Sequence, residues 1–184
     1  MSNVWFTSDQ HFFHNNVIKY CNRPFETVEE MNAAMIANWN TVVAKGDSVY
    51  MLGDFAFVNK ITQAEGLIGQ LNGHIHWVYG NHDAKCKSAK GVAWAGDYKE
   101  VKVGRHKFVC SHYPMVTWNG CHRGTIMLHG HCHGSLPDDG RLLRFDVGVD
   151  SFNFTPVSAD QLIEMAEARK VANGGTIVAL DHHK

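Results

Sequence analysis

The sequence of 184 residues lacks the long apolar segments that anchor a chain in a membrane. It contains no run of about 18 apolar residues, which is the length that a membrane-spanning helix needs. Residues 1–6 have neither the basic stretch nor the apolar stretch of a secretory signal. These absences predict a protein of the cytoplasm with no membrane partner.

Paired cysteines and an excess of charge of one sign are also missing. The five cysteines are an odd number and include no C-x-x-C pair, so the sequence indicates neither a zinc knuckle nor a thioredoxin-type redox site. We expect all five to be reduced thiols. The 17 basic and 18 acidic residues leave a net charge of −1, which gives no strong nucleic-acid signature. Nothing in the composition sets an oligomeric state.

Histidine, in contrast, is abundant, with thirteen residues. Histidine is the commonest metal ligand in proteins and a common general acid or base. Two of the thirteen, His182 and His183, belong to a polar C-terminal tail and are not expected to take part in a site. The chain shows no linker, internal repeat or low-complexity tract, so residues 1–184 are predicted to form a single domain with its own core.

Strand patterns and helix patterns alternate through the first half of the chain. Apolar runs at residues 3–8, 48–52 and 75–79 predict strands. Apolar residues at three- and four-residue spacing predict a helix over 28–44, and a second helix pattern begins at residue 62. Strands that alternate with helices predict βαβ units and a largely parallel sheet.

The second half contains shorter strands and one further helix. Strands are predicted at residues 98–103, 106–111, 125–128 and 143–149, and Ser158 begins a helix that runs to about residue 171. A loop that contains residues 15–24 is predicted after the first strand, and residues 84–96 are predicted to form a second irregular loop. These patterns alone predict a mixed α/β domain.

Five of the predicted strands are followed directly by side chains that can bind metals. Ligands bind at the carboxyl ends of strands in open α/β sheets, so these side chains are candidates for one site. They supply carboxylate, amide and imidazole donors but no thiolate, which suits a hard or borderline divalent ion. Seven ligands are too many for one tetrahedral ion, but they divide into two sites of about four if one carboxylate bridges. The seven ligands are Asp9, His11, Asp54, Asn81, His112, His131 and His133. His82 and Asp83 follow the third strand directly after Asn81.

The same motifs resemble the ordered motif set of the calcineurin-like metallophosphoesterases. The likeness spans residues 4–135, and the compact length resembles the small prokaryotic and phage members of that superfamily. It implies an α/β fold of four layers, in which a two-sheet β-sandwich is flanked by helices. It also implies a hydrolase that uses a binuclear metal centre.

The resemblance assigns a role to each motif residue. Two divalent ions are implied, with manganese favoured over iron, nickel, zinc or magnesium. One ion would be held by Asp9, His11, Asp54 and His133. The other would be held by Asp54, Asn81, His112 and His131, with Asp54 as the bridge.

The resemblance also implies a reaction in which a metal-bridging hydroxide attacks phosphorus in line. His82 would bind no metal and would protonate the leaving-group oxygen as a general acid. Asp83 would either orient His82 or cap the turn that follows it. Both residues are therefore predicted to be catalytic.

One departure from the protein-phosphatase branch of the superfamily bears on the substrate. That branch continues its Gly-Asp motif with Asp-Arg-Gly, whereas Phe55 and Ala56 follow Asp54 here. The arginine that clamps a phosphomonoester dianion is therefore missing, which favours a phosphodiester. Arg23, in the loop after the first strand, is predicted to bind substrate as a replacement cation.

Two alternatives to a phosphodiesterase remain open. The chain could be a phosphomonoesterase that acts on a nucleotide, a sugar or a protein, or a non-catalytic scaffold on the same fold. The intact motif set, including His82, argues against a scaffold. The expected substrate is a small phosphate ester, nucleotides included. Tyr113, Trp118 and Arg123 lie between two ligand segments, where they could form a substrate wall or belong to the core.

Overall fold

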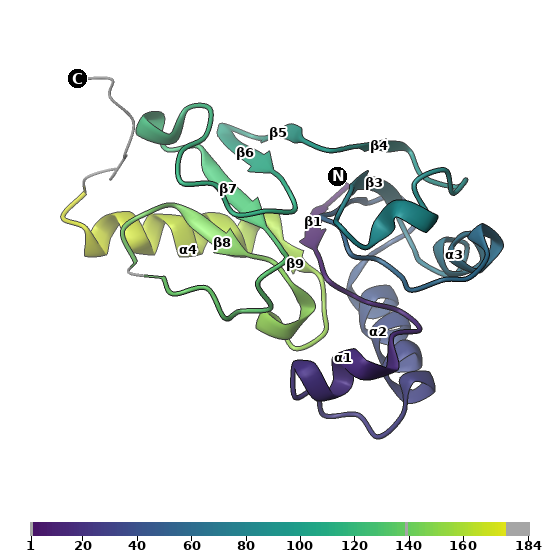
Figure 1. Ribbon diagram of the computed structural model, residues 1–184. Helices are drawn as coiled ribbons and strands as arrows, with labels where there is room; N and C mark the ends of the chain where they lie inside the picture. Colours follow the sequence, from purple (N-terminus) through teal and green to yellow (C-terminus); the bar gives the residue numbers. More distant parts are fainter. Residues whose placement is uncertain (1, 139, 176–184) are drawn as a thin grey trace.

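The computed structural model describes residues 2–138 and 140–175, so His182 and His183 lie outside the described residues. Two β-sheets form the centre of the molecule (Figure 1). The first sheet has the strand order β4-β3-β2-β1-β9, with β1 (Val4–Thr7), β2 (Ser48–Met51), β3 (His74–Val78), β4 (Trp94–Gly96) and β9 (Val157–Ser158). The second has the order β5-β6-β7-β8, with β5 (Lys99–Val103), β6 (His106–Cys110), β7 (Ile126–His129) and β8 (Arg144–Asp146).

Each sheet is mostly parallel and has one antiparallel edge strand. Strands β1 to β4 run parallel to one another, and β9 pairs antiparallel with β1. In the second sheet β6, β7 and β8 are parallel, while β5 forms an antiparallel hairpin with β6. The predicted βαβ units are therefore present, because helices connect the parallel strands of the first sheet.

The structure has four α-helices within the described residues: α1 (Asn15–Tyr20), α2 (Val28–Val42), α3 (Ile61–Ile68) and α4 (Ala159–Ala172). Three of them, α2, α3 and α4, confirm the predicted helices. Helix α2 begins after Thr27, whose hydroxyl accepts a hydrogen bond from the Glu30 amide at 3.2 Å. Helix α4 begins after Ser158, which forms a capping box with Gln161. Short 3-10 helices are η1 (Asp83–Lys85), η2 (Cys121–Arg123) and η3 (Val149–Ser151).

The strand predicted over 143–149 is shorter in the structure, where β8 spans Arg144–Asp146, and three further short elements lie in segments predicted to be loops. Helix α1 occupies part of the segment predicted as a loop, and η1 and β4 occupy parts of the segment 84–96. Each is six residues long or shorter, and α1 buries only Val17. Elements this short are too brief to show a periodic apolar pattern, so tertiary packing rather than local sequence sets their conformation.

Two apolar clusters hold the layers together. In the first, Trp39 of α2 and Ile75 of β3 belong to a core between helices α1 to α3 and the first sheet. In the second, Phe6 of β1 contacts Phe108 of β6 with ring centroids 5.0 Å apart, which joins the two sheets face to face. Leu162 of α4 is buried in the same cluster. The predicted α/β fold, a two-sheet sandwich with helices, is confirmed.

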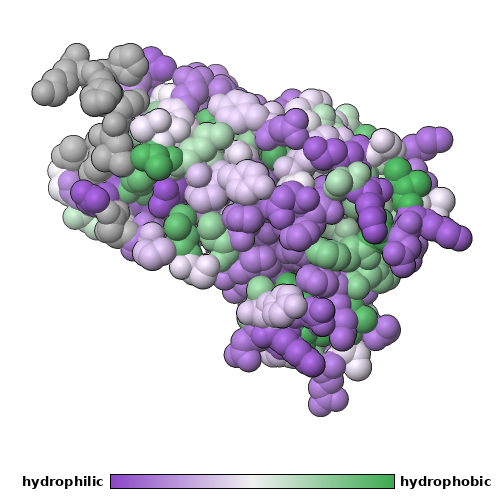
Figure 2. Space-filling model, viewed as in Figure 1, coloured by the Kyte–Doolittle hydropathy of each residue, from purple (hydrophilic) through white to green (hydrophobic). Residues whose placement is uncertain are grey.

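The surface and the cysteines agree with the composition. No helix among the described residues is long and apolar enough to cross a bilayer. Hydrophilic side chains gather in the middle of the face drawn in Figure 2, between the second sheet and the side of α1 and α2. Among the described residues, the five cysteines form no disulfide bond with one another.

Candidate metal centre

The loops that follow β1, β2, β3 and β7 are hydrogen-bonded to one another at one edge of the sandwich. The Asp9 amide donates to the Gly53 carbonyl at 3.0 Å, which joins the loops after β1 and β2. The Asp54 amide donates to the Asp83 carboxylate at 3.0 Å, which joins the loops after β2 and β3. The His131 amide donates to the Asp9 carboxylate at 3.0 Å, which joins the loop after β7 to the loop after β1. The polar residues at these strand ends therefore lie in one place.

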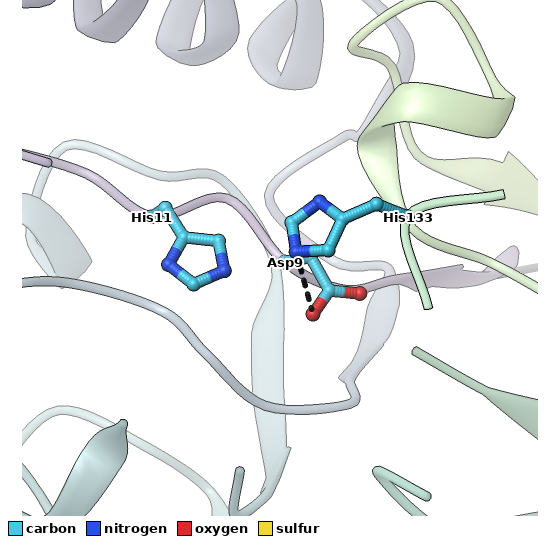
Figure 3. Close-up of side chains that lie close together, drawn as sticks. All are labelled: Asp9, His11 and His133. Carbon is cyan, nitrogen blue, oxygen red and sulfur yellow. Dashed lines mark ion pairs between the residues drawn. The ribbon is translucent and has the colours of Figure 1, made fainter. Parts of the chain in front are cut away.

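A first group of potential ligands consists of Asp9, His11 and His133 (Figure 3). One ligand atom from each lies within 4.8 Å of the others. His133 Nε2 is 4.0 Å from Asp9 Oδ1, and the rings of His11 and His133 stack with centroids 5.1 Å apart. Asp9 is fully buried, so its carboxylate lies on the side of this group that faces the protein interior.

A second group consists of Asp54, His112 and His131, whose ligand atoms also lie within 4.8 Å of one another. His112 Nε2 is 3.5 Å from Asp54 Oδ2 and 3.0 Å from Asn81 Oδ1. Asn81 therefore lies at this group too, with an oxygen that can coordinate a cation.

Asp54 lies between the two groups. Its Oδ2 is 3.6 Å from His11 Nε2 and 3.5 Å from His112 Nε2, so one oxygen faces a histidine of each group. Its Oδ1 accepts a hydrogen bond from the His82 amide at 2.9 Å, which fixes the orientation of the carboxylate. All seven predicted ligands thus lie in two adjoining groups, and Asp54 of the second group faces His11 of the first.

The backbone at these residues is unusual. Five of them have positive φ angles, a conformation that costs a residue other than glycine about 1–3 kcal/mol. Such a cost persists only where surrounding contacts enforce it, and residues of this kind cluster at functional sites. The angles are 58° at Asp9, 52° at His11, 54° at Asp54, 69° at His131 and 47° at His133.

Gly80 allows the loop after β3 to approach Asp54 closely. A Cβ atom at Gly80 would lie 2.5 Å from the Asp54 amide nitrogen and would also overlap its carboxylate. Gly130 is placed in the same way against the side chains of Ser8 and Asp9. Both positions require glycine because a methyl group would displace a candidate ligand.

We therefore expect Gly80→Ala to lower the free energy of unfolding by about 1–3 kcal/mol through overpacking. Gly66→Ala is the matched control, because a Cβ atom there would meet nothing within 4 Å and Gly66 lies inside α3. That control should be stabilised by about 0.4–1 kcal/mol. Urea unfolding of both variants measures the difference, and equal stabilities would contradict the close approach described above.

His11 provides the test of whether the residues fit a metal ion. Its Nδ1 and Nε2 atoms are both buried, and neither has a hydrogen-bond partner among the described residues. Burial lowers the pKa of His11 to about 2, so the ring is neutral. One of its two nitrogens then carries no proton and offers a lone pair. A buried polar atom without a partner costs about 1–3 kcal/mol, and a bound cation would remove that cost. The donor set and this unpaired imidazole fit a divalent ion.

Burial and hydrogen bonding also affect two other donors, Asp9 and His112. Burial raises the pKa of Asp9 to about 6, an effect that the neighbouring His133 opposes. His112 Nδ1 lies 2.8 Å from the Leu52 carbonyl, which can only accept a hydrogen bond. With the proton of a neutral ring on Nδ1, the lone pair of Nε2 faces Asp54 and Asn81, where a cation could accept it.

His82 lies beside the centre and faces solvent. Its side chain is 46% exposed, and its Nε2 is 4.0 Å from Asp54 Oδ2. Its ring centroid is 4.8 Å from that of Phe57, a partly exposed aromatic residue. His82 is thus close enough to act on a molecule bound at Asp54.

The structure corrects the prediction for Asp83. Its carboxylate is fully buried and accepts hydrogen bonds from the amides of Phe55 at 2.8 Å and Gly80 at 2.7 Å. It also accepts from the Asp54 amide and from the Trp77 indole nitrogen at 3.1 Å. The prediction that it orients His82 or caps the next turn is wrong, because both oxygens hold the loop that carries Asp54.

The prediction for Arg23 is wrong as well. Its side chain is fully buried, and its Nε and Nη2 atoms each donate to the Asp150 carboxylate at 2.8 Å. Nη1 donates to the Gln10 carbonyl at 2.9 Å, and Nη2 also donates to the Asp9 carbonyl at 2.7 Å. This guanidinium supports the loop after β1 and is not available to substrate.

Asp150 is a residue of the site that the sequence prediction missed. Its Oδ2 is 2.7 Å from His133 Nδ1. The signal was present, because Asp150 follows the predicted strand 143–149 as the other acidic residues follow their strands. The expectation that ligands follow the carboxyl ends of strands would have included Asp150.

The three residues considered for a substrate wall separate in the structure. The Tyr113 hydroxyl lies 3.3 Å from Asn81 Oδ1, its ring centroid is 4.7 Å from that of His131, and the residue is half exposed. Trp118 is buried, and its indole nitrogen donates to the Thr125 carbonyl at 2.8 Å. Arg123 lines a separate hollow at the opposite end of β6 and β7. Only Tyr113 borders the metal centre.

Comparison with known proteins gives likenesses over nearly the whole chain. No family model matches it. An uncharacterized protein of Methanocaldococcus jannaschii, MJ1445, is 37% identical over 177 residues, which cover 93% of this chain and 95% of the relative. The Gene 66 protein of Mycobacterium phage L5 is 28% identical over 197 residues, which cover 90% of this chain and 94% of the relative.

Among solved structures, the protein of unknown function AQ665 from Aquifex aeolicus superimposes with a TM-score of 0.73. The alignment covers 90% of this chain and 100% of that chain at 22% identity. This likeness is one of fold.

Proposed function

We propose that this chain, which belongs to the family of the archaeal protein MJ1445, is a phosphodiesterase that depends on two metal ions. Its ordered motifs on a two-sheet fold place it in the calcineurin-like metallophosphoesterase superfamily. The observation that carries the proposal is the position of Asp54 Oδ2, 3.6 Å from His11 Nε2 and 3.5 Å from His112 Nε2. A carboxylate that faces two histidine groups in this way can bridge two cations.

The division of the ligands follows the two groups of side chains, and both sites would share Asp54. Oxygen and nitrogen donors of this kind bind manganese, iron, nickel, zinc or magnesium, and we expect manganese. When bound, a pair of such ions activates a water molecule and neutralises charge on the phosphate oxygens. One site would be formed by Asp9, His11 and His133, and the other by Asn81, His112 and His131.

His82 would supply the proton that the leaving oxygen needs. An alkoxide is a poor leaving group at neutral pH, and protonation by an imidazole typically accelerates its departure by about 10²–10⁴-fold. His82 Nε2 is 4.0 Å from Asp54 Oδ2 and its side chain is 46% exposed, so the ring can reach a substrate that binds at the centre from the solvent side. Phe57 and Tyr113 border the same space on two sides. A small ester of phosphate, nucleotides included, suits this site.

The engagement of Arg23 supports a diester over a monoester. A phosphomonoester dianion gains most from a guanidinium that is free to form two hydrogen bonds. Arg23 was the cation that the sequence offered for this task. Its Nε and Nη2 atoms instead donate to the Asp150 carboxylate at 2.8 Å. We therefore propose a substrate with a single negative charge on phosphorus, hydrolysed in the cytoplasm by one domain over residues 1–184.

Metal analysis together with two chromogenic esters tests the proposal. The protein loaded with Mn²⁺ should contain two ions per chain and should hydrolyse bis-p-nitrophenyl phosphate faster than p-nitrophenyl phosphate. Removal of the ions with a chelator should abolish both activities. Faster turnover of the monoester would favour a phosphomonoesterase. Absence of both metal and turnover would favour a scaffold.

A further inference from the structure

His133 makes its shortest polar contact on the side of its ring that faces away from the candidate ligands. Its Nε2 points towards Asp9, at 4.0 Å from Oδ1. Its Nδ1 lies 2.7 Å from Oδ2 of Asp150, whose side chain is only 9% exposed and is carried by η3. The Cys21 thiol is a second neighbour of the same nitrogen, at 3.3 Å.

Asp150 is itself held rigidly by Arg23. The guanidinium forms two parallel hydrogen bonds of 2.8 Å with the two carboxylate oxygens, a geometry that fixes both planes. The same guanidinium donates to the carbonyls of Asp9 and Gln10. An unbroken series of contacts therefore runs from the backbone of one candidate ligand, Asp9, through Arg23 and Asp150 to another, His133.

This arrangement determines which nitrogen of His133 carries the proton. A carboxylate can only accept a hydrogen bond, so Nδ1 must donate to Asp150. The lone pair of the neutral ring is then on Nε2, which faces Asp9 and the first group of ligands. A carboxylate behind a ligating imidazole fixes its tautomer and its orientation and makes it a stronger donor to a metal.

The two groups differ in this respect. In the second group, His112 Nδ1 donates to a neutral backbone carbonyl, that of Leu52, at 2.8 Å. In the first group, His133 Nδ1 donates to a charged carboxylate at 2.7 Å. A charged partner makes a ligating imidazole a stronger donor than a neutral carbonyl does, so of these two rings His133 should be the stronger donor.

We propose that Asp150 is a positioning residue, which Arg23 holds in place and which sets His133 as an Nε2 ligand and selectively strengthens the first metal site. This inference rests on the proposed function, since it concerns the affinity of a site within that centre. It gives Arg23 a role behind the metal ligands in place of the substrate contact that the sequence suggested.

Asp150→Asn is the informative variant. If the amide oxygen stays at the position of Oδ2, the amide NH₂ group faces the Arg23 Nε, which is also a donor. If the amide flips, its NH₂ group faces the Arg23 Nη2, which is a donor as well, and His133 Nδ1, where it favours the tautomer with the proton on Nε2. Either arrangement weakens the first site, and the typical loss for such a partner is about 10–100-fold in metal affinity.

Asp138→Asn is the matched control, because Asp138 also pairs with an arginine, Arg169, at 2.7 Å but contacts no candidate ligand. Cys21→Ala is a second control, which removes the other neighbour of His133 Nδ1. Calorimetric titration with Mn²⁺ should show one of two binding events weakened about 10–100-fold in Asp150→Asn, with the other changed less than about twofold. Both controls should match the wild type. Equal affinities in Asp150→Asn and Asp138→Asn would overturn the inference.

A measurement on the unaltered chain needs no variant to fold. A long-range ¹H–¹⁵N spectrum of the metal-free wild type, recorded at alkaline pH so that the ring is neutral, should show His133 with a protonated Nδ1 and an unprotonated Nε2, and the opposite tautomer would overturn the inference. If the wild type bound no Mn²⁺ at all, the proposed function would fail while this spectrum still reported on Asp150. The two failures are therefore distinguishable.

Discussion

Replacing Asp54 with alanine should empty both metal sites and reduce turnover of bis-p-nitrophenyl phosphate by at least about 10³-fold. The reason is geometric, because the same oxygen lies within 3.6 Å of His11 Nε2 and within 3.5 Å of His112 Nε2. Removal of any other single ligand should deplete one site more than the other. Metal content per chain, measured by mass spectrometry after gel filtration, reports the loss directly.

The matched control for this experiment is Asp97→Ala. Asp97 is a carboxylate whose side chain is 83% exposed and which pairs only at 3.6 Å with Lys87. This control should keep two ions per chain and full activity. Retention of one ion at full stoichiometry in Asp54→Ala would show that Asp54 belongs to a single site. Circular dichroism of both variants verifies that the fold survives the substitution.

His82→Ala should give the opposite pattern, with both ions retained and turnover of esters with poor leaving groups reduced by about 10²–10⁴-fold. His82 belongs to neither group of candidate ligands, and its side chain is 46% exposed. We therefore expect both sites to bind their ions without it. p-Nitrophenolate leaves without a proton, so bis-p-nitrophenyl phosphate should be affected far less than an alkyl diester.

His74→Ala serves as the control, because His74 is an exposed histidine at the start of β3. Its kinetics with the alkyl diester and with the nitrophenyl diester should both match the wild type. Loss of a metal ion from His82→Ala would contradict the assignment of this residue as an acid. An equal loss of rate for both diesters would contradict it too.

Most of the fold could be predicted because its longer elements carry periodic apolar patterns. Helix α2 buries Met31, Met35 and Trp39, which are spaced four residues apart, and Thr27 marks its start. Helix α1 has six residues and a single buried one, Val17, so no period can be seen in it. Its position depends on contacts with distant parts of the chain.

The candidate ligands could be found for a similar reason. Each follows an apolar strand, and parallel strands bring their carboxyl ends to one edge of a sheet. Sequence alone could not say which polar residues at that edge face the centre. Asp83 follows β3 as Asn81 does, yet its carboxylate turns inward to the amides of Phe55 and Gly80.

The role of Arg23 depends on a hydrogen-bond partner that is remote in sequence. Arg23 and Asp150 are 127 residues apart, and no local pattern links them. Before the fold is known, an arginine near a phosphate site suggests a substrate contact. The buried pair shows instead how the chain supports His133 and the backbone of Asp9 from behind.

The central claim is that Asp54 bridges two ions, and anomalous diffraction from crystals of the Mn²⁺-loaded protein tests it most directly. The account predicts two peaks about 3.5–4 Å apart, one on each side of Asp54 Oδ2. One peak should lie among Asp9, His11 and His133, and the other among Asn81, His112 and His131. A single peak, or a peak among Cys21, His133 and Asp150, which also come within 4.8 Å of one another, would contradict it.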